Sequence, residues 1–451
     1  MLKNKITNKR SIYFFSFGLI CAVACGLSVK AQEATERISI DGAIRIALAH
    51  NRQAAIAKLD EKIATANYRQ TDAIFLPDVS ASYSAYTTND PLSSFGFKLE
   101  QQVISSNDFN PTLLNHPERT SNYNASLTVK QPLVNLDMWY ARKGAKLQAD
   151  MYTYSSERNR QYLVFQVQQA CMQLQLAYDV TKVLEQARRT AQEAYRFTND
   201  RYQQGLLQKS DVLNAEVEIS NMESDLAKAK SGIANASDNL AMLLGRPAGT
   251  VYQITDSLNV SLSGNFNSLV PQQRADLAAM QKSVDAANMM VKSGRMGYLP
   301  KLNAFGNFQY NDSRVAGFGA NSYFAGIQLS WDIFKGNRTR RQVEIQTLQR
   351  DKLAEQFAQQ KDQAQLELDK AMRDLSDANI ALKQQHLAVE QSADALRILQ
   401  NRYAQGLVNT TDLLAAQTQL AQRGLALAQA KFSAQIANAY INLLTTITNP
   451  Q

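Results

Sequence analysis

The chain has 451 residues, of which 45% are hydrophobic and 20% are charged, a balance typical of an ordered protein. Its formal charge is +8, but residues 1–31 hold five basic side chains and no acidic one, so that without them 43 basic side chains face 40 acidic ones. A remaining charge of about +3 excludes the strongly basic surface typical of proteins that bind nucleic acid.

Residues 1–31 have the pattern of a secretory signal. Four basic side chains within the first ten positions precede an apolar run from Ile12 to Leu27. The sequence VKAQ follows and indicates cleavage after Ala31. The apolar run is short for a membrane-spanning helix, so we expect this segment to be removed rather than to anchor the chain.

The cysteines leave one alternative open for this segment. A lipoprotein signal would be cleaved before Cys25, although Ala22 is a weak residue at the third place upstream. Cleavage after Ala31 would leave Cys171 alone, and no intrachain disulfide could then form. We expect Cys171 to be a small, buried helix residue.

Helical periodicity dominates the rest of the chain. A seam of apolar or small residues, three and four positions apart, runs from Val212 to Leu243. Shifted by 201 residues, nine of its ten positions are again apolar, Arg423 being the exception. The sequence therefore predicts two halves. Helices are expected at about 40–72, 137–200 and 206–245 within residues 32–250, and at about 272–297, 337–401 and 407–446 within residues 251–451.

After Leu76-Pro77 and again after Leu299-Pro300, the apolar period changes from helical to two. We expect two strands after each pair, with one apolar and one polar face, at about 78–88, 121–131, 301–310 and 322–332. Their lengths are near the roughly 9–11 residues of a membrane-spanning strand. A long polar loop of about 88–120 joins the first two strands, and a shorter loop of about 311–321 joins the second two.

Four such strands cannot form a closed membrane structure alone. An open sheet edge in lipid costs several kcal/mol for each unpaired backbone group, and the smallest bacterial barrels use about eight strands. The barrel must therefore be shared between subunits, and three copies would supply twelve strands. We expect a mainly α-helical fold with a membrane β-barrel part, built from duplicated helix-strand-strand-helix halves.

The repeat is most evident in two short stretches. Residues 201–213 read RYQQGLLQKSDVL, and residues 402–414 read RYAQGLVNTTDLL. In both, a glycine at a helix end can adopt the left-handed conformation. The Ser-Asp and Thr-Asp pairs that follow can cap the next helix. Each stretch is thus predicted to be a tight helical hairpin turn. One interpretation is that its glycine and aspartate serve only to form that turn.

Together these features resemble the TolC-type outer-membrane efflux family over essentially the whole mature chain. The resemblance implies a homotrimer with a shared 12-stranded β-barrel in the outer membrane and a long α-helical coiled-coil barrel in the periplasm. It implies an exit duct for a tripartite efflux or type I secretion system. The partners would be outer-membrane lipid, a periplasmic adaptor protein and an inner-membrane RND or ABC pump, with no cofactor and no nucleic acid.

The resemblance also implies roles for residues of the hairpin tips. Adaptor docking falls on two Gly-Leu pairs, and the periplasmic gate falls on an acidic ring position and on a carboxylate and a tyrosine that tie two hairpins together. A second ring position is Ala415 and a basic latch position is Val408, so this chain departs from the family pattern at both. The docking residues are Gly205, Leu206, Gly406 and Leu407, and the gate residues are Asp412, Asp211 and Tyr403.

Other classes of protein explain less of the sequence. The three histidines, His50, His116 and His386, fall in different elements with no metal-ligand spacing, so we expect no enzyme and no metal site. A structural coiled-coil protein without transport activity would explain the helices but not the strands. An adaptor protein should contain one long helical hairpin rather than two. The sequence does not identify the cargo.

Overall fold

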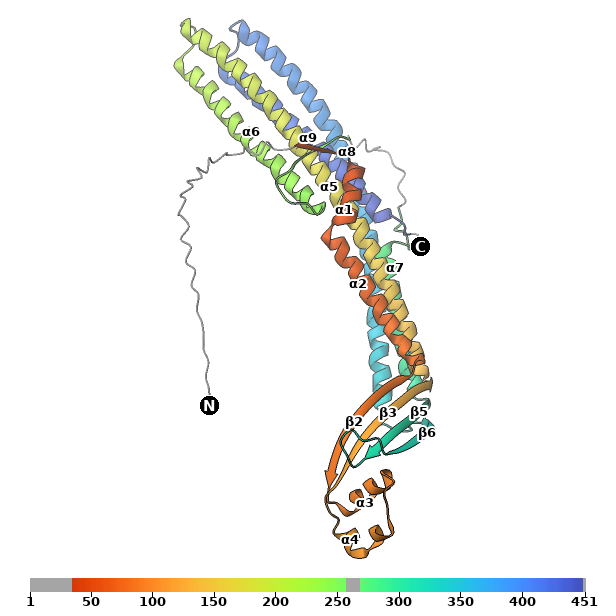
Figure 1. Ribbon diagram of the computed structural model, residues 1–451. Coiled ribbons are helices and arrows are strands. Elements are labelled where there is room, and N and C mark those ends of the chain that lie inside the picture. Colours follow the sequence, from red (N-terminus) through yellow and green to blue (C-terminus); the bar gives the residue numbers. More distant parts are fainter. Residues whose placement is uncertain (1–34, 257–267, 449–451) are drawn as a thin grey trace, which may run out of the picture. The chain divides into compact units, whose positions relative to one another are not determined.

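The computed structural model describes residues 35–256 and 268–448. The expected signal segment, with Cys25 and its cleavage site, lies outside these residues. The described part consists of long helices and two small sheets (Figure 1). Within it, no helix is both long and apolar enough to cross a membrane.

The helix expected at 40–72 is interrupted at one residue. Helix α1 spans Ile40–His50, α2 spans Arg52–Gln70, and the short 3-10 helix η1 spans Thr71–Phe75. Asn51 separates α1 from α2 because its Oδ1 accepts a hydrogen bond from the Ala54 amide (3.1 Å), which makes it the N-cap of α2. Its Nδ2 also donates to the Leu243 carbonyl (2.9 Å), so the break is held by tertiary contact.

The remaining long helices form two antiparallel hairpins and one shorter helix. Helix α5 spans Leu136–Gln203, α6 spans Lys209–Leu243, α7 spans Ala275–Met296, α8 spans Arg338–Ala404 and α9 spans Thr410–Thr445. The predicted seam lies in the interface, since Ala215, Leu240 and Ile441 are fully buried. Cys171 is 1% exposed, and its burial raises the pKa of the thiol to about 12.

A two-stranded parallel sheet joins the beginnings of the two halves. Strand β1 spans Thr35–Ile38 and pairs with β4, which spans Val251–Ile254. Tyr252 is 1% exposed and packs in a core with residues of α1, α5 and α6. These strands were not expected, because four residues are too few to show a period of two.

The larger sheet has four antiparallel strands in the order β2-β3-β5-β6. Their bounds are Asp78–Thr88, Thr120–Val134, Lys301–Asp312 and Ala320–Ser330. Within the described residues, β2 and β6 each have a partner strand on one side only.

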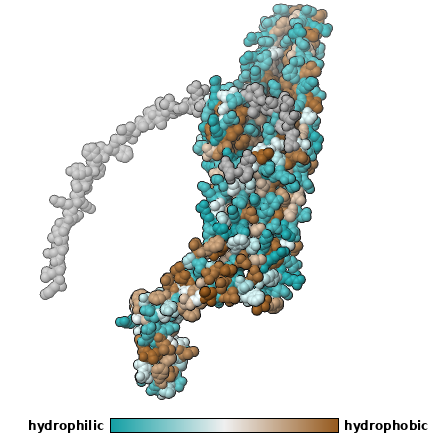
Figure 2. All heavy atoms as spheres, turned by 90° about the vertical axis from the view of Figure 1, so that its right-hand side faces the viewer, coloured by the Kyte–Doolittle hydropathy of each residue, from teal (hydrophilic) through white to brown (hydrophobic). Residues whose placement is uncertain are grey.

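The register of the larger sheet aligns its side chains into two contrasting faces. One face is polar and carries Ser80, Ser82, Asn122, Asn124, Ser126, Thr128, Asn307 and Gln309. The other is apolar and carries Val79, Tyr123, Leu127, Phe308, Tyr323, Ile327 and Leu329. Figure 2 shows apolar atoms gathered over the strands and where the strands meet the helices.

The β2–β3 connection, expected to be a polar loop, is folded. It contains helix α3 (Pro91–Glu100), the 3-10 helix η2 (Ser106–Phe109) and helix α4 (Pro111–Asn115). The sequence carries a signal for both helices, because Asp90-Pro91 and Asn110-Pro111 each place an N-cap residue before a proline at the first helical position. We call residues 91–115 the cap segment.

Candidate functional site at the hairpin tips

The α5–α6 and α8–α9 turns lie at the end of the helical bundle that is opposite to the larger sheet (Figure 1). Gly205 and Gly406 have φ of +73° and +76°, the left-handed region that favours glycine. The Leu206 amide donates to the Arg201 carbonyl (2.9 Å), and the Leu407 amide donates to the Arg402 carbonyl (3.0 Å). Both tips therefore end their first helix in the same Schellman turn.

The tip leucines point away from the rest of the chain. Leu206 is 65% exposed and Leu407 is 63% exposed, although large apolar side chains usually gain by burial. The glycine turns hold them at matched positions. The tips thus present two equivalent apolar points.

The caps of the outgoing helices differ from those predicted. We expected Ser210 with Asp211 and Thr411 with Asp412, but the N-cap residues are Gln208 and Asn409, because α6 and α9 begin at the next residue. At the first tip, the Asp211 carboxylate accepts a hydrogen bond from the Gln208 amide (3.2 Å). At the second, the Asn409 side chain accepts from the Asp412 amide (2.7 Å).

The resemblance led us to expect a hydrogen bond between Tyr403 and Asp211, but these two side chains are not bonded to each other. Its side chain is 3% exposed, and its Oη lies 2.9 Å from Thr198 Oγ1 and 3.0 Å from Thr410 Oγ1. Both threonines are buried, so the tyrosine hydroxyl completes its bonding inside the bundle while Asp211 caps its own helix. The three hydroxyls link α5, α8 and the start of α9.

Arg201 makes a second link between the tips, one that the sequence did not predict. Its Nη1 donates to the Tyr403 carbonyl (3.1 Å) and its Nη2 donates to the Ala404 carbonyl (2.5 Å). These carbonyls lie at the C-terminus of α8, where the helix dipole gives them partial negative charge, and the Tyr403 carbonyl also accepts from the Gly406 amide (3.0 Å). The guanidinium also lies 4.7 Å from the centre of the Phe197 ring. Arg201 of the first hairpin thus caps the C-terminus of α8 in the second hairpin.

The remaining tip residues show no comparable contacts. Asp412 and Ala415 are exposed in the first turns of α9, and Val408 is half-buried. The carboxylate of Asp412 is favoured there by the N-terminal end of the helix dipole. Among the described residues, no group of three or more His, Cys, Asp or Glu side chains is placed to hold a metal ion.

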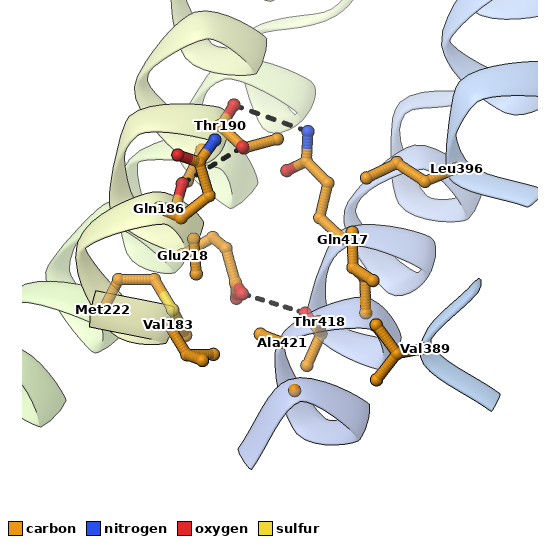
Figure 3. Close-up of a pocket in the computed structure, with 14 residues that line it drawn as sticks. Val183, Gln186, Thr190, Glu218, Met222, Val389, Leu396, Gln417, Thr418 and Ala421 are labelled. Atoms are coloured by element: carbon orange, nitrogen blue, oxygen red, sulfur yellow. Dashed lines mark hydrogen bonds between the residues drawn. The ribbon is translucent and has the colours of Figure 1, made fainter. Parts of the chain in front are cut away.

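A cavity of about 220 Å³ lies between the two hairpins (Figure 3). Its wall includes Met222, Leu396 and Ala421, and two polar contacts join the hairpins here, the first from Thr418 Oγ1 to Glu218 Oε1 (2.9 Å). Gln417 reaches the Thr190 carbonyl at 3.4 Å, while its Oε1 is buried without a partner. Packing between the hairpins is therefore less complete at this level than in the buried hydroxyl group around Tyr403.

Comparison with known proteins identifies the family. The family model described as outer membrane efflux protein matches residues 43–246 and 268–446. A curated relative from Salmonella typhimurium, named "Probable outer membrane lipoprotein SilC", is 22% identical over 422 residues, which cover 89% of this chain and 84% of the relative.

Solved structures share the fold. The structure of CusC superposes with a TM-score of 0.79 at 18% identity, over 92% of this chain and 94% of that one. The outer membrane protein VceC from Vibrio cholerae gives a TM-score of 0.77 at 20% identity, over 90% and 96%. The matched family and folds are those of channel proteins rather than enzymes. The chain belongs to the outer membrane efflux protein family and is an exit duct for efflux in the outer membrane.

Proposed function

We propose that three copies of this chain form one continuous duct, whose hairpin tips dock onto a periplasmic adaptor protein and, through it, onto an inner-membrane RND or ABC pump. Cargo would pass through the helical part in the periplasm and leave between the strands. The observation that carries the proposal is the presence of two incomplete surfaces at opposite ends of the described part of the chain, a sheet whose edges have no partner strand there and a pair of exposed apolar tips.

The unpaired edges support assembly. Strands β2 and β6 are the outer strands of the sheet, and each leaves one row of backbone groups without a strand partner among the described residues. In a lipid environment these groups must be satisfied by another strand. If β2 of one copy pairs with β6 of the next, three copies supply twelve strands and no edge remains.

The tips support docking. Leu206 and Leu407 are held by rigid turns and remain largely exposed, as is typical of residues that insert into a partner's apolar pocket. A partner that bridges the two tips would bury both leucines at once. The helical hairpin of an adaptor protein has the shape for such a contact.

The same end of the duct would form the gate. The buried Tyr403 hydroxyl and the Arg201 guanidinium tie the two hairpins of one copy together. Asp412 is exposed in the first turn of α9, so three copies would present a ring of carboxylates to the tunnel. Asp211 would act indirectly, by capping the helix that follows the first tip.

Detergent extraction tests the assembly. Membranes solubilised in a mild detergent should yield a particle of about three chains, each no heavier than the 50.2 kDa of the unprocessed chain. Purified trimers should also conduct ions in planar bilayers, and trimers that failed to conduct would contradict a continuous duct. A periplasmic monomer would contradict the proposal as a whole.

Site-specific cross-linking tests the docking. A photo-reactive residue at Leu206 or Leu407 should capture an adaptor protein through its helical hairpin, identified by mass spectrometry of the linked peptides. Val217 is the matched control, because it is 59% exposed on the same helix hairpin but away from the tip. Equal capture from all three positions would mean that the tips are not the docking point.

A further inference from the structure

The cap segment lies against one particular face of the larger sheet. Gln101 Nε2 donates to the Ser121 carbonyl (2.8 Å) and to Asn122 Oδ1 (3.0 Å). Glu100 accepts a hydrogen bond from Asn122 Nδ2 (3.1 Å). Asn122 belongs to the polar face, in line with Asn124, and it is 1% exposed under this contact. The cap segment therefore covers the polar face at the end of the sheet where β2 and β3 are joined.

Several further contacts make the cap segment an ordered body. Ser93 donates its amide to the Asp90 carboxylate (2.9 Å), and Phe97 packs on Tyr86 of the polar face with ring centres 5.8 Å apart. Gln102 Nε2 donates to the Asn321 carbonyl on β6 (3.2 Å), so the segment spans from one edge strand to the other.

The charge of the cap segment is largely neutralised within it. Lys98 Nζ lies 2.7 Å from Asp108 Oδ1, and the Ser105 amide donates to Asp108 Oδ2 (2.7 Å). The Lys98 and Ser105 hydrogen bonds lower the pKa of Asp108 to about 2. A carboxyl group whose pKa is lowered by folding stabilises the fold at any pH above the pKa that it has in the unfolded chain. This contribution is therefore lost only as the pH falls from about 4 towards 2.

Large apolar side chains are exposed among polar ones on the cap segment. Five large side chains remain exposed on it, at values from 42% to 82%: Leu92, Leu99, Val103, Phe109 and Leu113. Such a surface on a segment that also makes many polar bonds indicates a missing partner.

The location of the polar face identifies that partner. In a barrel shared by three copies, the apolar faces meet lipid and the polar faces line the lumen. The three cap segments then lie inside one mouth. Twelve strands leave about 25 Å between opposite backbone walls, and a helix with side chains is about 10 Å across. Three bodies of this width would meet near the centre.

We propose that the cap segment is a plug in the outer mouth of the duct, and that its apolar surface packs against the same segment of the two neighbouring copies. The plug rests on the proposed trimer, because only a shared lumen brings the segments together. It would restrict entry from outside and would have to separate or shift when cargo leaves.

Thiol labelling from outside the cell tests the plug without depending on the periplasmic gate. Ser82 lies on the polar face, six register pairs inside the Thr88–Thr120 pair. A Ser82→Cys variant should react slowly with a membrane-impermeant, polyethylene-glycol-linked maleimide. Replacing residues 89–119 with Asn-Gly, a two-residue turn suited to that register, should make the reaction several-fold faster.

Val315 provides the matched control for labelling. It lies in the β5–β6 loop, which leans on the apolar face, since the Ala316 amide donates to Tyr83 Oη (2.8 Å). It is 71% exposed, so Val315→Cys should react equally fast with and without the cap segment. Fast labelling of Ser82→Cys in the intact chain would overturn the plug. Slow labelling in both forms, with Val315→Cys reacting normally, would mean that the polar face lines no open lumen, which overturns the plug as well.

Cross-linking tests the contact between copies and separates the two proposals. Leu92→Cys should form a disulfide or a short bis-maleimide link between copies, while Val315→Cys should not. A detergent-stable trimer with no Leu92→Cys link and with fast Ser82→Cys labelling would overturn the plug and leave the trimer standing. A monomer in detergent would overturn both.

Discussion

At the first hairpin tip, between α5 and α6, Tyr202 is exposed and the Asp211 carboxylate accepts a hydrogen bond from the Gln208 amide. At the second tip, between α8 and α9, the equivalent Tyr403 is buried and the Asp412 carboxylate is exposed. The glycine and leucine amides of each turn donate to equivalent carbonyls of the preceding helix. Both bonds measure 2.9 Å at the first tip and 3.0 Å at the second. The repeat therefore specifies the turn, and the surroundings decide what each side chain does.

The difference arises from contacts between the hairpins. Arg201 of the first tip reaches the last carbonyls of α8, whereas its equivalent, Arg402, is exposed. Tyr403 finds Thr198 across the interface. The second tip is thus held by the first, and the reverse contacts do not form. Both tips have a capping bond of their own, at Asp211 and at Asn409, but the second tip also depends on a link to the other hairpin that can be broken.

The largest effect is expected from the turn glycines. Gly205→Val and Gly406→Val force a β-branched residue into the left-handed region, which costs roughly 1–2 kcal/mol or more. Both variants should lower the unfolding temperature of the trimer in detergent and abolish adaptor binding. Asparagine tolerates this conformation, so Gly205→Asn and Gly406→Asn are the controls and should retain most binding. Normal binding by the valine variants would mean that tip geometry is irrelevant to docking.

Substituting the equivalent arginines Arg201 and Arg402 should reduce stability by different amounts at the two tips. Arg201→Gln removes two hydrogen bonds to helix-end carbonyls and one contact with the Phe197 ring, and should cost about 1–2 kcal/mol because the site is only partly exposed. Arg402→Gln should change stability by less than about 0.5 kcal/mol, as is usual at exposed positions. Thermal unfolding of both variants side by side measures the difference. Equal losses would show that the two tips are energetically equivalent.

The equivalent tyrosines Tyr202 and Tyr403 allow the same comparison, with a smaller expected loss of stability. Tyr403→Phe leaves two buried threonine hydroxyls without their shared partner and should cost about 0.5–1.5 kcal/mol. If this link holds the closed tip, single-channel conductance in planar bilayers should rise several-fold. Tyr202→Phe is the control, because Tyr202 is 39% exposed, and should conduct like the parent. A parent-like Tyr403→Phe channel would remove Tyr403 from the gate.

Much of this fold could be predicted because its signals are local. A glycine at each helix end, a seam of period 3.5 and strands of period two all reflect the geometry of one element. The family resemblance built on them is confirmed by the match to outer membrane efflux proteins. Even the cap segment had a local signal, in Asp90-Pro91 and Asn110-Pro111, although its place on the polar face did not.

The links between the tips could not be predicted in the same way. Thr198 and Tyr403 are 205 residues apart, and their contact depends on how α5 lies beside α8. Because the two stretches have nearly the same letters, sequence alone assigns their tyrosines and aspartates equal roles. The break at Asn51 was missed for a different reason, because helical periodicity on both sides outweighed the signal of a single capping residue.

The most specific effect on transport is expected from the aspartates, and the smallest effect on stability is expected from Asp412. Asp211→Ala removes a capping bond and should cost about 1 kcal/mol without changing cation block. Asp412→Ala removes no hydrogen bond of the carboxylate that the structure describes, so stability should stay within about 0.5 kcal/mol of the parent. Three exposed carboxylates around a narrow opening would attract cations, and their loss should weaken block by divalent or trivalent cations. Titrating such a cation against both variants in planar bilayers separates capping from gating. Full block of the Asp412→Ala channel would mean that the acidic ring lies elsewhere, and weakened block of the Asp211→Ala channel would mean that the two tips share the gate after all.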